Sequence, residues 1–166
     1  MKFIPESIID TAIEELGELP VLDSALEQMA IEQPTLLAYL TSENATAFSD
    51  SEKDFLFFAT SVIILAIRKN ELALPDLGVP LLTRIEEENY MMLMEAKGKI
   101  FRERITIFFE GYSQEDLLAF VEDALEEDEE ELITKEGRDY LFVMLKTIID
   151  AFDASISVPE NGVEEV

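Results

Sequence analysis

The 166-residue chain carries 37 acidic and 12 basic side chains, a net charge of −25, and it has no cysteine and no histidine. These absences exclude disulfides, thiol catalysis, zinc–thiolate sites and every catalytic triad that uses imidazole. The charge disfavours nucleic acid and anionic membranes as partners, because both attract clustered Lys and Arg, whereas a hydrophobic content of 48% is enough for a folded core.

Apolar residues at helical spacing predict three helices in the first 40 residues. The first begins at Pro5 and ends near Gly17, and the second stops near Pro34, which itself starts a short third helix. A polar loop over residues 41–48 then leads to Ser49 and Glu52, which have the spacing of a capping box.

The helix opened by this cap includes residues 55–67, the longest uncharged run in the chain. Its thirteen residues are fewer than the roughly 20 that span a bilayer. They are apolar on nearly all sides, so we expect this helix at the centre of the protein.

A Pro/Gly-rich connection over residues 74–80 separates the two halves of the chain. A long helix is predicted from about Pro80 towards Lys97, where Gly98 ends it, kinks it or lies within it. After an apolar segment over residues 100–109, Ser113 and Asp116 suggest a cap for the next helix. Thr134 is predicted to cap the last long helix, and residues 154–166 are predicted to form a flexible acidic tail.

Two segments of the second half resemble segments of the first half. Gln33–Leu40 (QPTLLAYL) aligns with Gln114–Val121 (QEDLLAFV), 81 positions later, and Ser49–Ile67 aligns without a gap with Thr134–Phe152, 85 positions later. We therefore predict an all-α, single-domain bundle of seven to eight helices over residues 1–153. Its halves, about 1–73 and 80–153, would be duplicated with approximate two-fold symmetry.

Carboxylates are the one abundant chemical group. Glu14, Glu15 and Glu18 form an EExxE pattern on the first predicted helix, where Glu14 and Glu18 would share a face and could hold a hard divalent cation. All-helical nucleotide pyrophosphatases of the MazG type combine this pattern with a later ExxD. Here the first ExxD, Glu136–Asp139, lies far downstream, so the required spacing is absent. We interpret the three acids as a solvated helix face and predict no metal, no cofactor and no catalytic residue.

Two charged clusters are candidates for partner contact. The basic cluster comprises Lys97, Lys99, Arg102 and Arg104, and it either pairs with nearby acidic helices or binds an anion or an acidic peptide. The acidic run is either a solvated segment or a docking strip for a basic partner. It comprises Glu126, Glu127, Asp128, Glu129, Glu130 and Glu131.

A soft apolar cluster, Tyr90, Met91, Met92 and Met94, is interpreted as core packing, with an exposed groove for a partner helix as the alternative. Taken together, these features predict a non-enzymatic, cytoplasmic protein-interaction module that binds a basic or amphipathic protein. The alternatives are a carboxylate-dependent divalent-metal hydrolase acting on a nucleotide and an acidic DNA mimic with two rows of carboxylates. Homodimerisation through an apolar face is a further expectation.

Overall fold

Eight α-helices and two short 3-10 helices, with no strand, make up the secondary structure of residues 1–71 and 73–156, the part of the chain that the computed structural model describes. This confirms the predicted all-α bundle. The elements in chain order are α1 (Glu6–Leu16), α2 (Leu19–Glu32), α3 (Pro34–Leu40), η1 (Glu43–Ala47), α4 (Asp50–Asn70), α5 (Val79–Glu95), α6 (Phe101–Ile105), η2 (Thr106–Phe109), α7 (Glu115–Glu126) and α8 (Lys135–Ser155).

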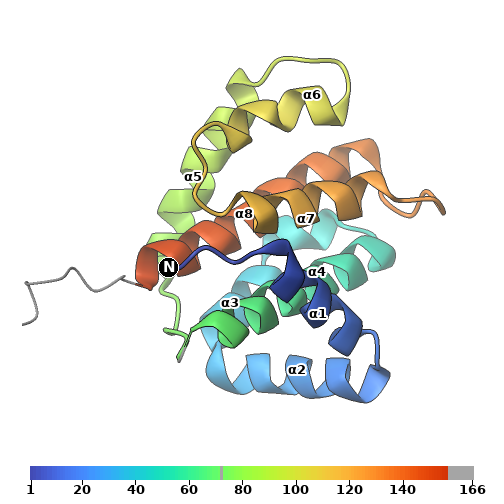
Figure 1. Ribbon diagram of the computed structural model, residues 1–166. Coiled ribbons are helices and arrows are strands. Elements are labelled where there is room, and N and C mark those ends of the chain that lie inside the picture. Colours follow the sequence, from blue (N-terminus) through green and yellow to red (C-terminus); the bar gives the residue numbers. More distant parts are fainter. Residues whose placement is uncertain (72, 157–166) are drawn as a thin grey trace, which may run out of the picture.

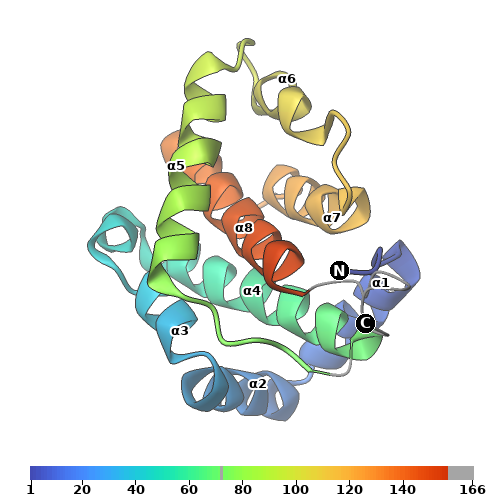
Figure 2. The same cartoon turned by 90° about the vertical axis from the view of Figure 1, so that its left-hand side faces the viewer.

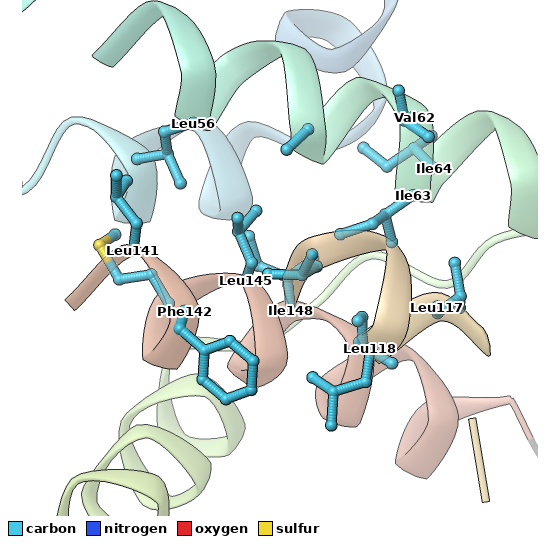
Figure 3. Close-up of a cluster of buried hydrophobic side chains, with 14 of the residues drawn as sticks. Leu56, Val62, Ile63, Ile64, Leu117, Leu118, Leu141, Phe142, Leu145 and Ile148 are labelled. Carbon is cyan, nitrogen blue, oxygen red and sulfur yellow. The ribbon is translucent and has the colours of Figure 1, made fainter. Parts of the chain in front are cut away.

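The two longest helices, α4 and α8, lie at the centre of the bundle (Figures 1 and 2). They are 21 residues each and pack against one another, while α1 and α2 cover α4, and α5 and α7 cover α8. Figure 3 shows the contact, in which Leu56 and Ile63 of α4 face Leu141, Leu145 and Ile148 of α8. All five are fully buried, so the predicted central helix is confirmed. Within the described ranges, no helix is both long enough and apolar enough to cross a membrane.

Both long helices begin with the predicted side-chain caps. Ser49 Oγ accepts a hydrogen bond from the Glu52 backbone N–H (3.1 Å), and Glu52 Oε1 accepts one from the Ser49 N–H (2.9 Å), which completes the capping box. Thr134 Oγ1 accepts from the Gly137 N–H at 2.9 Å. Because unpaired N–H groups at a helix start need acceptors, these bonds fix where α4 and α8 begin.

The predicted cap of α7 by Ser113 and Asp116 is wrong. The residue before α7 is Gln114, which makes no side-chain cap to that helix. The Ser113 hydroxyl instead donates to Asp153 (3.0 Å), and Asp116 Oδ2 accepts from the backbone N–H of Glu6 at the start of α1 (3.0 Å). Both residues thus bond to a neighbouring helix, Ser113 to α8 and Asp116 to α1, rather than capping α7. The spacing within the sequence cannot distinguish these two uses.

Gly98 lies two residues after Ala96, the residue that caps the end of α5. Its φ of 134° is a conformation that residues with a Cβ rarely adopt. A Cβ there would also lie 2.5 Å from Cβ of Glu103. The glycine therefore lets the chain turn back closely onto α6. At the other end of this half, α8 continues through Ser155, so residues 154 and 155 of the predicted tail are helical; residues 157–166, the rest of that prediction apart from Ile156, lie outside the described residues.

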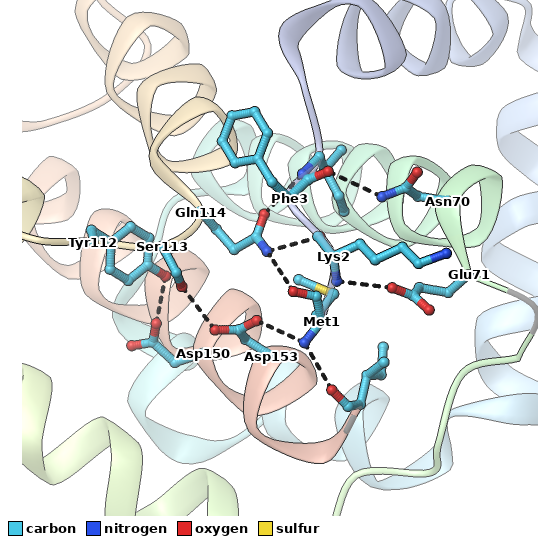
Figure 4. A network of polar contacts seen from close by, with 12 residues as sticks. Met1, Lys2, Phe3, Asn70, Glu71, Tyr112, Ser113, Gln114, Asp150 and Asp153 are labelled. Carbon is cyan, nitrogen blue, oxygen red and sulfur yellow. Dashed lines mark hydrogen bonds and ion pairs between the residues drawn. The ribbon is translucent and has the colours of Figure 1, made fainter. Parts of the chain in front are cut away.

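Two buried glutamines each hold the extended segment that leads into the first helix of the opposite half of the chain. Gln114 accepts from the Ile4 N–H (3.1 Å) and donates to the Lys2 carbonyl (3.0 Å), as Figure 4 shows. Gln33 donates to the Pro75 carbonyl (2.9 Å) and accepts from the Leu77 N–H (3.4 Å). Each glutamine directly precedes a helix and binds the segment that leads into another, α1 or α5.

Candidate functional site

A groove of about 450 Å³ runs between α1 and α7, which lie side by side. Its apolar surface comes from both helices and from α4, and consists of Ile9, Ile13, Phe58, Ala119, Phe120 and Ala124. Its acidic residues are Glu6, Asp10, Asp116, Asp123 and Glu127. Within the described part of the chain, no Lys or Arg is among the lining residues of this acidic groove.

Helical periodicity explains why acidic and apolar side chains share this surface. Asp116, Phe120 and Asp123 are separated by four and three positions, which places them on one face of α7, and Glu127, the residue that caps the end of the helix, follows four positions later. The opposite face of α7 is apolar, with residues such as Leu118 fully buried against the core. One helix therefore uses one side for folding and leaves a mixed acidic and apolar side exposed in the groove.

The two ends of the groove are tied down differently. At the start of α1, the backbone N–H of Glu6 donates to Asp116, which joins α1 to α7 directly. Near the end of α7, the Arg102 guanidinium lies 3.6 Å from Asp123 and 3.7 Å from Glu122. Within the described residues, Asp10 makes no ion pair at all. Among the described residues, Asp10 and Glu127 are thus left without a neutralising partner, whereas Asp123 has Arg102.

Burial and acidic neighbours together affect the ionisation of Glu122, which lies beside the groove. Burial raises the pKa of Glu122, the Arg102 guanidinium opposes this, and the charges of Asp123 and Glu126 raise it further, so that the net pKa lies above its usual range. Glu122 is thus more difficult to ionise than an ordinary carboxyl group although it lies next to Arg102. Burial and the negative neighbours therefore outweigh the effect of the arginine. The groove is therefore suited to a cationic ligand with an apolar side.

The expectation that Glu14 and Glu18 share a helical face is wrong. Helix α1 ends at Leu16 and Gly17 caps it, so Glu18 lies outside the helix and does not share a helical face with Glu14. Glu15 is paired with Lys69 of α4, with Oε2 and Nζ 2.7 Å apart. In the described part of the chain, no group of three or more acids is placed to hold a metal ion.

The basic cluster is divided between two environments. Arg104 donates to Asp139 (2.8 Å) and to the Lys99 carbonyl (3.1 Å), while Arg102 lies beside the acids of α7. Lys97 and Lys99 are exposed in the connection between α5 and α6, and neither forms an ion pair with another described residue. The arginines therefore help to fix α6 to the bundle, and only the lysines remain available at the surface.

The acidic run is partly structural. Asp128 accepts hydrogen bonds from the Leu132 N–H (3.0 Å) and the Ile133 N–H (2.8 Å), which closes the turn after α7. Glu131 adopts a φ of 53° in the same turn. Glu127 is the member of the run that lines the groove. Glu127 is thus the contribution of the run to the groove, and Asp128 and Glu131 shape the loop into α8.

The interpretation of the methionine cluster as core is wrong for two of its members. Met91 and Met94 are 63% and 84% exposed, whereas Tyr90 and Met92 are partly buried. Figure 2 shows the end of α5 extending past α8 towards α6. This part of α5 has a neighbour on one side, and the side chains on its other side point to solvent.

A buried polar network between α5 and α8 has no counterpart in the sequence predictions. The Lys146 ammonium donates to Asn89 Oδ1 (2.9 Å) and Asp150 Oδ2 (2.7 Å), and it lies 4.7 Å from the centre of the Tyr112 ring. The Tyr112 hydroxyl donates to Asp150 Oδ1 (2.5 Å). Burial and the Asp150 charge raise the pKa of Tyr112, so it stays neutral. Lys146 and Asp150, four positions apart on an apolar helix, were the available signal.

Sequence reasoning had also missed four of the five acids in the groove: Glu6, Asp10, Asp116 and Asp123. Each helix taken alone is an ordinary amphipathic helix, and the groove exists only where the two meet. Comparison with known proteins finds no family model, no curated protein and no solved structure that matches the chain.

Proposed function

We propose that the protein is a non-enzymatic, cytoplasmic helical binding module, and that its groove between α1 and α7 receives a basic amphipathic segment of another protein. The observation that carries this proposal is the composition of the groove, five carboxylates around an apolar floor with no basic side chain among its described lining residues. A helix with Lys or Arg on one side and apolar residues on the other matches both features.

Physical considerations support the same choice of ligand. The apolar floor contributes affinity through the burial of hydrocarbon surface, at roughly 25 cal/mol per Å². The acidic side chains and the net charge of −25 accelerate encounter with a basic partner and exclude acidic ones. Because these charges are exposed, the association should weaken as salt is added.

The test is a calorimetric titration of the protein with a Lys/Leu peptide that is designed to form an amphipathic helix. The variant Asp10→Lys/Glu127→Lys reverses two charges in the groove and should bind about tenfold more weakly, or roughly 1–2 kcal/mol, at low salt. The matched control, Asp23→Lys/Glu27→Lys, makes the same change of net charge on exposed positions of α2 and should bind like the wild type. Equal loss in both variants would show attraction to net charge alone and would refute a groove-specific site.

The same titration separates the alternatives. An acidic DNA mimic would bind a scrambled peptide of equal charge as well as the amphipathic one, whereas the groove requires the apolar face. A metal-dependent hydrolase would bind a divalent cation and turn over a nucleotide without any peptide. A homodimer would appear as a doubled mass in sedimentation.

Internal duplication is a second proposal, about the origin of this bundle. In support, the caps of α4 and α8 correspond at an offset of 85 residues, with Ser49 matching Thr134 at the start and Glu71 matching Ile156 at the end. Gln33 and Gln114 have similar backbone angles (φ/ψ −130°/58° and −109°/51°) and are both 1% exposed. Each half thus holds the leading segment of the other through an equivalent glutamine.

Equivalence of the two glutamines can be measured. Gln33→Leu and Gln114→Leu should each lower the free energy of unfolding by about 2–3 kcal/mol, because each leaves buried backbone groups without partners. Gln28→Leu is the control, since this exposed glutamine donates to Glu32 of its own helix (3.1 Å) and to no other described residue, and it should change stability by less than about 0.5 kcal/mol. A negligible effect at either buried glutamine would contradict the proposed equivalence.

A further inference from the structure

A second cavity, of about 520 Å³, lies where the starts of α4 and α8 meet the middle of α5. Three aromatic side chains line it: Phe48, Tyr90 and Tyr140. The rings of Tyr90 and Tyr140 are 5.8 Å apart and inclined at 59°, so they form two walls of a corner. Phe48 is buried, while Tyr140 is 48% exposed and borders the opening. The volume is in the range of small-molecule sites, roughly 300–1,000 Å³.

Two carboxylates, Glu52 and Glu136, complete the polar part of the lining, and no Lys or Arg is among the described residues around it. Glu52 is 2% exposed. Burial raises its pKa, but hydrogen bonds from the Ser49 and Thr134 backbones and side chains lower it, and the net pKa lies below its usual range. Glu52 therefore carries its negative charge at neutral pH, in the lining of an aromatic cavity.

The hydrogen bonds of Glu52 restrict the kind of cation that fits beside it. Its Oε1 accepts from the Ser49 N–H, and its Oε2 accepts from both the N–H and the hydroxyl of Thr134 (3.0 Å each). A carboxylate has about four acceptor positions, and three are already in use. Glu52 thus offers charge beside aromatic surface but few free acceptors, so the space next to it suits a cation that donates no hydrogen bonds.

We propose that this cavity binds a methylated ammonium group, with its methyl groups against Phe48, Tyr90 and Tyr140 and its charge balanced by Glu52 and Glu136. Aromatic faces attract such cations through the ring quadrupole, and quaternary ammonium needs no acceptor. Burial, the Glu86 charge and Tyr140 raise the pKa of Tyr90, which keeps its ring neutral. The cavity shares no lining residue with the groove between α1 and α7, so this site and the proposed peptide site succeed or fail separately.

The probe is choline, titrated by calorimetry against its neutral isostere 3,3-dimethyl-1-butanol, which has the same shape without the charge. Choline should bind saturably at one site and about tenfold more tightly than the alcohol. Equal binding of both compounds, or no binding of choline, would overturn the proposal. A peptide containing trimethyllysine forms a second arm: tighter binding than choline supports the site and assigns the ammonium to a protein side chain, and binding weaker than choline assigns it to a free small molecule.

Variants of Tyr140 test the role of the ring without disturbing the core, because this side chain is half exposed. Tyr140→Leu should weaken choline binding by at least about fivefold. Tyr140→Phe keeps the ring and should bind within about twofold of the wild type, and a loss equal to that of Tyr140→Leu would refute a ring-based site. Phe3→Leu is the matched control, since it removes an exposed ring (46% exposed) outside the cavity and should leave choline binding unchanged.

Discussion

Replacing Gly137 by Ala should destabilise this protein, although the same change stabilises an ordinary helix position by about 0.8–1.0 kcal/mol. Gly137 lies in the first turn of α8, and the side chain of Glu52 from α4 fills the space beside it. A Cβ at position 137 would lie 1.8 Å from Oε2 of Glu52, 2.7 Å from its Cδ and 2.8 Å from Oγ1 of Thr134. The Glu52 carboxylate would therefore have to move out of this position.

The size of the effect follows from the bonds that the carboxylate would give up. Glu52 Oε2 accepts from the N–H and the hydroxyl of Thr134, and Oε1 accepts from Ser49. Losing these bonds costs about 1 kcal/mol each. Set against the gain in helix propensity, the loss of about 3 kcal/mol leaves Gly137→Ala less stable by about 2 kcal/mol.

The assay is urea unfolding followed by far-UV circular dichroism, applied to Gly137→Ala, Glu52→Ala and the double variant. Glu52→Ala alone should also lose stability, because it removes the same hydrogen bonds. In its background the space is vacant, so adding Gly137→Ala should now stabilise the protein by about 0.5–1 kcal/mol. The coupling between the two positions should therefore be about 3 kcal/mol.

Two results would refute the reasoning. If Gly137→Ala were as stable as the wild type, the Glu52 carboxylate would not be fixed where the structure has it. If Gly137→Ala changed stability equally with and without Glu52, the two residues would be independent, and the effect of the substitution would have a cause other than the contact with Glu52.

Three further predictions follow from buried polar groups. The folded-state pKa of Glu52 is lowered, so its contribution to the free energy of unfolding is complete above the usual carboxyl pKa and is lost as pH falls through the lower folded value. Acid should therefore destabilise the wild type more steeply than Glu52→Gln. Parallel curves of unfolding free energy against pH for the two proteins would contradict this. Thr60→Val should stabilise by about 1 kcal/mol in thermal unfolding, because its buried hydroxyl has no hydrogen-bond partner among the described residues, whereas Thr147→Val breaks a 3.1 Å bond from Asn89 and should destabilise by about 1–2 kcal/mol. Lys146→Met should cost about 3 kcal/mol in urea unfolding, since the partners of the ammonium stay buried without it, and a neutral result would show that the network is dispensable.

The sequence by itself determined the longer helices, the caps at Ser49 and Thr134 and the central position of α4, but not the short helices η1, α6 and η2. These features depend on interactions within a few residues of the chain. A capping box joins positions three apart, and a helix that is apolar on all sides must be buried whatever surrounds it. Local sequence patterns therefore predicted most of the secondary structure and which helix is buried at the core.

Only the tertiary structure decided which surfaces meet. The groove exists because α1 packs beside α7, and Asp10 and Glu127, which line it together, are separated by more than a hundred positions in the chain. The contact of Glu52 with Gly137 has the same character, since a carboxylate of one helix occupies the space left by a glycine of another. Such pairings depend on complementary shape and charge between distant segments, and periodicity within one segment contains no information about the segment that it will face.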